Sequence, residues 1–149
     1  MVEARRYKMK QKSFNIYLAI DGVLLANELN LANHAQDFLK YILTTYPDTT
    51  YWLTTHCRGD AHTPIQRFGH FFDEETVTLM KRIKPTNWNI NKTEAIDFET
   101  PFLWFDDDLF EGEKIDLMKH NTLDSWCEID LAQNENQLLD ILNLLNKAQ

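Results

Sequence analysis

The sequence predicts an α/β domain in which helices flank a parallel β-sheet in a three-layer, Rossmann-like arrangement. Two observations lead to this prediction. Apolar runs rich in β-branched and aromatic residues alternate with segments whose apolar residues recur at helical spacing, an alternation typical of parallel sheets. The chain of 149 residues, of which 44% are hydrophobic, is also long enough for one domain with one core.

Four apolar runs are predicted to form the strands of the sheet. They cover residues 14–20, 50–54, 101–105 and 125–129. The first run is followed by Asp21 and Gly22, two residue types that favour turns. The third ends abruptly in three consecutive aspartates, Asp106–Asp108.

Helices are predicted between these strands from the spacing of apolar residues. The longer ones are expected at about residues 33–45, 73–83 and 134–146, with shorter ones starting near residue 63 and covering residues 92–96. Asp73 is expected to cap the helix that follows it, because aspartate side chains accept hydrogen bonds from the first helical N–H groups.

The composition limits which partners the protein is expected to bind and in which compartment it is expected. We expect a single domain over residues 14–149, preceded at residues 1–13 by a basic and flexible tail. The net charge of −8 argues against a nucleic acid as the main partner. No apolar run is long enough to cross a bilayer, and two cysteines are too few for a disulfide scaffold. These features predict a cytoplasmic protein with buried thiols, whose oligomeric state the sequence leaves open.

Polar residues follow three of the predicted strands, where the carboxyl ends of parallel strands form ligand sites. These residues are Asp21, Thr54 with Thr55, and Asp106 with Asp107, and Lys92 precedes the third strand. Carboxylate and hydroxyl oxygens suit Mg²⁺, and a lysine can neutralise a phosphoryl oxygen. The sequence therefore predicts a site for Mg²⁺ and a phosphorylated ligand or protein partner.

The order of these motifs resembles that of haloacid dehalogenase (HAD) superfamily phosphatases. The four segments that carry the resemblance are Ala19-Ile20-Asp21-Gly22-Val23-Leu24, Leu53-Thr54, Lys92 and Phe105-Asp106-Asp107. The short stretches between them leave no room for a cap domain, as in the capless class. The resemblance spans most of the chain from Phe14 to Asp107.

The resemblance implies a role for each matching position. Asp21 would be the general acid and base, and its backbone carbonyl would bind Mg²⁺. Thr54, Thr55 and Lys92 would hold the phosphate oxygens. Asp106 and Asp107 would hold the metal directly or through water.

The sequence departs from the family pattern at the position of the nucleophilic aspartate, which is Ala19. A methyl group can neither attack phosphorus nor coordinate a cation, so Mg²⁺ binding should be weakened. The leading hypothesis is therefore a catalytically impaired pseudophosphatase that retains a phosphate- and Mg²⁺-compatible pocket. The alternatives are a Mg²⁺-dependent phosphoester hydrolase that acts by another route, or whose nucleophile was substituted by Ala19, and a non-catalytic interaction module.

Simpler interpretations exist for each motif. Asp21 and Gly22 can form only a turn, the threonines can be ordinary strand residues, and Lys92 can be a surface lysine. His56 and Cys57 begin a pattern like the loop of cysteine phosphatases, but the arginine that this loop requires is replaced by Thr63. The histidines match no zinc-binding spacing, so we expect them to be scattered structural or surface residues.

Overall fold

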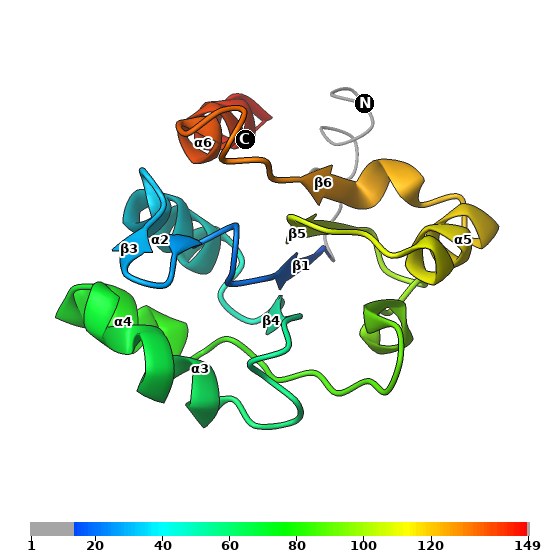
Figure 1. The fold of residues 1–149 in the computed structure, drawn as a ribbon, viewed down its shortest axis with the longest axis horizontal. Coiled ribbons are helices and arrows are strands. Elements are labelled where there is room, and N and C mark those ends of the chain that lie inside the picture. The colour runs from blue at the N-terminus through cyan, green and yellow to red at the C-terminus, as the bar shows by residue number, and fades with distance from the viewer. Residues whose placement is uncertain (1–13, 149) are drawn as a thin grey trace.

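The computed structural model describes residues 14–148, and the predicted tail at residues 1–13 lies outside the described residues. The predicted α/β fold is confirmed: a four-stranded parallel sheet is flanked by helices (Figure 1). The strands lie in the order β4-β1-β5-β6. Their bounds are Asn15–Leu18 for β1, Thr50–Trp52 for β4, Phe102–Asp106 for β5 and Trp126–Glu128 for β6.

The position of β1 in this order explains where a site can form. Leu18, its last residue, pairs with Trp52 of β4 on one side and with Phe105 of β5 on the other. After β1 the chain therefore forms β4 on one side of it, and later forms β5 on its other side. Such a reversal opens a crevice at the carboxyl ends of the strands.

Alternate residues of the strands face opposite sides of the sheet, and both sides are buried. Ile16 and Leu18 belong to the larger core cluster, whereas Tyr17 between them belongs to a second cluster with Trp104 of β5. This second cluster also contains Leu117, from a helix that covers that side of the sheet. Burial on both faces accounts for the continuous apolar runs in the sequence.

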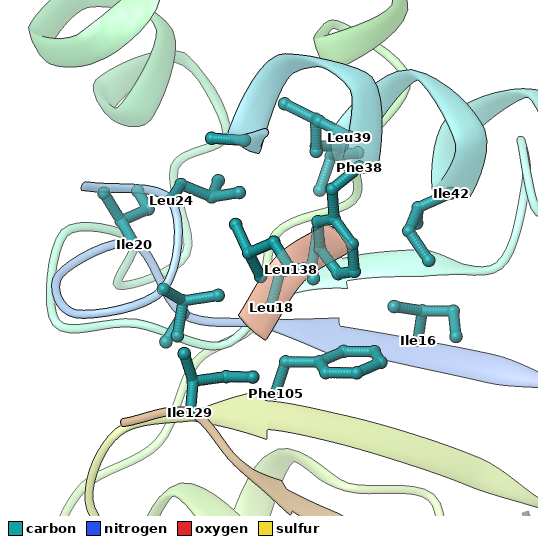
Figure 2. Packing of buried hydrophobic residues seen from close by; sticks show 14 of the residues in the cluster. Ile16, Leu18, Ile20, Leu24, Phe38, Leu39, Ile42, Phe105, Ile129 and Leu138 are labelled. Atoms are coloured by element: carbon teal, nitrogen blue, oxygen red, sulfur yellow. The ribbon is translucent and has the colours of Figure 1, made fainter. Parts of the chain in front are cut away.

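Helix α2, Ala35–Thr45, covers the first face of the sheet. Figure 2 shows Phe38 and Ile42 directed from this helix toward the strands. The ring of Phe38 meets that of Phe105 edge-on, with 5.4 Å between their centroids. Leu138 of helix α6, Gln137–Ala148, is fully buried and completes this side of the core.

The remaining elements surround the sheet. The other helices are α3 His62–Phe68, α4 Glu74–Met80, α5 Glu111–Lys119 and α6 Gln137–Ala148, with 3-10 helices η1 Gly69–Phe71, η2 Lys92–Ala95 and η3 Leu123–Ser125. Strands β2, Leu25–Asn27, and β3, Asn30–Leu31, form a separate antiparallel hairpin. The sequence did not predict α5 or this hairpin.

Several predicted boundaries were wrong by a few residues. Helix α2 starts two residues late because His34, just before it, adopts the left-handed conformation, with φ 66°. Helix α4 ends at Met80 rather than residue 83, because the chain then turns to pair with strand β4. There the N–H of Lys84 donates to the carbonyl of Thr50, 3.0 Å away.

The predicted cap at Asp73 is confirmed, since its Oδ1 accepts the N–H of Thr76 at 2.8 Å. The hydrogen bonds from Thr76 lower the pKa of Asp73 to about 2 from its ordinary value of 3.8. A lowered pKa in the folded state stabilises the fold above the ordinary pKa, and this contribution is lost as the pH falls through about 2.

We therefore expect Asp73→Ala to lower the melting temperature at neutral pH. Asp73→Asn should keep most of the cap, because its amide oxygen can still accept the same N–H group. Thermal unfolding from neutral to acidic pH checks this: both variants should lose less stability on acidification than the wild type. An unchanged acid dependence in Asp73→Asn would show that the Asp73 charge contributes nothing.

Two further expectations are addressed by the described residues. Cys57 and Cys127 are both buried, and neither forms a disulfide bond. Within residues 14–148, every helix is too short or too polar to cross a membrane.

Candidate functional site

The carboxyl ends of β1, β4 and β5 surround a cavity of about 170 Å³. All the site residues that the sequence predicted lie in its wall, although they are far apart in the chain. The lining residues are Ala19, Asp21, Thr54, Thr55, Lys92, Asp106, Asp107, Asp108, Phe110 and Glu113. The structure thus brings the predicted residues together and adds Asp108, Phe110 and Glu113 to them.

Strand β1 ends at Leu18, so Ala19 and Asp21 lie just beyond its carboxyl end, where the cavity is. The N–H of Ala19 still donates to the carbonyl of Phe105 at 3.0 Å, so its position remains tied to the sheet. The chain then turns sharply at Gly22, whose φ of 76° suits glycine best. The side chain of Asp107 lies directly against this glycine and would overlap any Cβ placed there.

Asp106 and Lys92 form a buried ion pair at one side of the cavity, with 2.8 Å between the Lys92 Nζ and the Asp106 Oδ2. The carboxylate is only 1% exposed and the lysine side chain 14% exposed. The other carboxylate oxygen of Asp106, Oδ1, accepts the N–H of Asp107 at 2.8 Å. Burial raises the pKa of Asp106 from 3.8 to about 6, although the nearby Lys92 ammonium acts to lower it.

Glu113, which sequence reasoning missed, fixes the backbone around Lys92. Its Oε2 accepts the N–H of Lys92 at 2.8 Å, and its Oε1 accepts the N–H of Phe110 at 2.9 Å. The residue is almost fully buried, so both oxygens are used where water has little access. It therefore links η2, which carries the lysine, to the start of α5.

Thr54 lies two residues beyond Trp52, the last residue of β4, and is 3% exposed. Its Oγ1 accepts the N–H of His56 at 3.2 Å. A hydroxyl that accepts one hydrogen bond keeps its own proton for another acceptor. Thr54 can thus donate to an anion in the cavity, and the exposed Thr55 lines the cavity beside it.

His56, which the sequence led us to expect as a structural or surface residue, makes side-chain contacts beside the cavity. Its Nε2 lies 2.7 Å from the Oδ2 of Asp21, and its Nδ1 lies 3.2 Å from the guanidinium of Arg67 in α3. No motif spacing predicts this contact, because the histidine and the aspartate are far apart in sequence. The pairing of β1 with β4 places the residues after both strands side by side.

Negative charge dominates the cavity wall. Among the described lining residues there is one ammonium, that of Lys92, and there are five carboxylates, those of Asp21, Asp106, Asp107, Asp108 and Glu113. These oxygens are the ligand type that Mg²⁺ prefers, and Mg²⁺ usually keeps several waters in its shell. Among the described residues, no three His, Cys, Asp or Glu side chains converge as a ready-made metal site, so water or ligand oxygens would have to complete the shell.

Comparison of the chain with family models finds no match, and comparisons with curated proteins and with solved structures find none either.

Proposed function

We propose that this chain is a HAD-like pseudophosphatase that binds a phosphorylated ligand together with Mg²⁺ but does not form a phosphoenzyme. The observation that supports the proposal best is that all four motifs line one small cavity, with the methyl group of Ala19 at the position of the nucleophile. A cavity of about 170 Å³ has the size of a small anionic group rather than of a whole metabolite.

The cavity offers both parts of a phosphate site. Lys92 and the hydroxyl of Thr54 are the donors for phosphoryl oxygens, and Thr55 provides a third. Because five carboxylates surround one lysine, a phosphate dianion needs a cation to enter. Mg²⁺ would be held by the backbone carbonyl of Asp21 and by Asp106 and Asp107, directly or through water, and it would neutralise the phosphoryl charge.

The same residues explain why ordinary phosphatase chemistry is not expected. Asp21 can hold or release a proton beside the cavity, but a proton carrier alone does not accept the phosphoryl group. Ala19 is 3% exposed and its side chain has no lone pair, so no covalent intermediate can form at this position. Binding is the function that the remaining groups can still perform.

The expected result of restoring the nucleophile is a gain of activity. Ala19→Asp should hydrolyse an aryl phosphate in the presence of Mg²⁺ about 100-fold faster than the wild type or better, because nucleophile removal in enzymes costs more than that. Ala19→Asn is the matched control, since it has the same size and no nucleophilic carboxylate. Steady-state rates with and without EDTA measure the difference.

The proposal also predicts a direct effect of ligands on the wild type. Mg²⁺ with an inert phosphate analogue should raise its melting temperature, because a ligand that binds only the folded state stabilises it. The same addition should have little effect on Asp106→Asn. Absence of a shift in the wild type, together with an inactive Ala19→Asp, would contradict a phosphate site and favour a purely structural interaction module.

A second candidate function is direct hydrolysis of a phosphoester by water. The hydrogen bond between Asp21 and His56 favours it, because a carboxylate held in place can accept a proton from water. In that case the wild type itself should be active with Mg²⁺, and Asp21→Asn should abolish the activity.

A further inference from the structure

Three side chains from different parts of the chain form a line of polar contacts that ends at the cavity. Asp21 follows β1, His56 lies in the loop between β4 and α3, and Arg67 belongs to α3 (Figure 1). The contacts measure 3.2 Å from the guanidinium NH1 to the imidazole Nδ1 and 2.7 Å from Nε2 to the Asp21 Oδ2. Of the three, only Asp21 lines the cavity.

The chemistry of arginine determines the direction of both hydrogen bonds. A guanidinium has only N–H donors, so Nδ1 of His56 must accept from Arg67. The proton of the neutral ring is therefore on Nε2, which donates to the carboxylate of Asp21. The ring of Phe68 meets the imidazole edge-on at 4.8 Å between centroids and limits its rotation.

Asp21 needs such a partner if it is to act at the cavity. Its side chain is 67% exposed, whereas that of His56 is only 16% exposed. Aspartates at turns commonly bond to backbone N–H groups nearby, but among the described residues the hydrogen bond found for the Asp21 carboxylate is the one with His56. Without the imidazole, an exposed carboxylate on a turn would move among several rotamers.

We propose that His56, oriented by Arg67 and Phe68, is a positioning residue that holds the Asp21 carboxylate in one orientation at the cavity. The importance of this orientation for chemistry rests on the proposed function, but the orientation itself can be measured separately. One oxygen of Asp21, Oδ2, is occupied by His56, and Oδ1 remains to accept a hydrogen bond from a donor in the cavity.

The first test uses NMR on the otherwise wild-type protein. The ¹⁵N shifts of His56 should report a protonated Nε2 and an unprotonated Nδ1, and three-bond couplings should report one χ1 rotamer for Asp21. His56→Leu should give averaged couplings at Asp21. His56→Gln is the matched variant, because its amide nitrogen can donate from a similar place, and it should preserve the single rotamer.

The second test asks whether the orientation matters for chemistry. In the Ala19→Asp background, His56→Leu should lower kcat about 10- to 100-fold with little change in KM, since a small misplacement of a catalytic group costs that much. His56→Gln should recover most of this loss. Equal losses in both variants would show that His56 has only a structural role.

The outcomes separate the two proposals. A protonated Nδ1 in the wild type, or a fixed Asp21 in His56→Leu, would overturn the positioning role whatever the activity. An inactive Ala19→Asp, together with a wild type that ligands do not stabilise, would contradict only the proposed function, and the NMR result would then decide the positioning role by itself.

Discussion

Replacement of Lys92 by methionine is expected to lower the free energy of unfolding by about 3–5 kcal/mol near pH 8, because it leaves a buried carboxylate without its partner. Asp106 is 1% exposed, and Lys92 is the only cation among the described residues that line the cavity. Methionine resembles the lysine stem in shape and keeps the backbone N–H that donates to Glu113. The loss should therefore come from the charge and not from packing.

The pH dependence of this loss has a definite sign. The pKa of Asp106 is raised to about 6 in the folded protein, so its favourable contribution is complete below the ordinary value of 3.8 and disappears as the pH rises through about 6. Because Lys92 acts to lower that pKa, its removal should raise the pKa of Asp106 further. The stability should then continue to decline up to a higher pH. Near pH 5, where the carboxyl can take up a proton, Lys92→Met should cost much less than near pH 8.

Chemical denaturation at both pH values measures the effect. The double variant Lys92→Met/Asp106→Asn is the control, because it removes the buried charge while the amide oxygen can still accept the N–H of Asp107. It should recover most of the stability near pH 8. Equal losses at both pH values, or no recovery in the double variant, would show that the ion pair is not the cause.

The centre of the fold could be predicted from the sequence because local patterns encode it. A strand buried on both faces requires a continuous apolar run, and the segments containing Leu18, Trp52 and Phe105 each have one. Polar residues at the ends of such runs must gather at one edge when the strands are parallel. For that reason Asp21, Thr54 and Asp106 could be expected in one cavity, whereas Lys92, which lies in η2 before β5, could be expected there only from the order of the motifs.

Helix α5 could not be predicted in the same way, because it has no apolar stripe. Ile115 is 46% exposed and Met118 is 56% exposed, which leaves Leu117 as its buried apolar contact with the second core cluster. The sequence does indicate a helix at its two ends. Glu111 and Glu113 lie in the first turn and Lys119 lies in the last turn, where these charges interact favourably with the helix dipole. Glu113 shows that this first turn also serves the cavity.

The contact of His56 with Asp21 depends on strand order, and no local pattern specifies strand order. Only the parallel pairing of Leu18 with Trp52 makes the two following loops neighbours. Metal-binding and nucleophile spacings in the sequence therefore do not reveal this contact. A search among residues within four positions of each predicted strand end would have included His56 as a candidate partner.

Gly22→Ala is the second substitution with a large expected effect, about 3 kcal/mol of destabilisation from two causes. The first is the backbone, since a φ of 76° strains any residue with a Cβ. The second is the side chain of Asp107, which would overlap the new Cβ and would have to move. Urea or guanidinium denaturation measures the total.

Gly59→Ala separates the two causes. Gly59 has a φ of +89°, but the nearest atoms to its added Cβ are those of Asn87, at 3.8 Å, an ordinary contact distance. It should therefore cost only the backbone strain, about 1–2 kcal/mol. The excess in Gly22→Ala then measures the displacement of Asp107, and the same displacement should weaken stabilisation by Mg²⁺ and a phosphate analogue. If both alanine variants lose the same stability and still bind these ligands, the close contact between Gly22 and Asp107 does not shape the cavity.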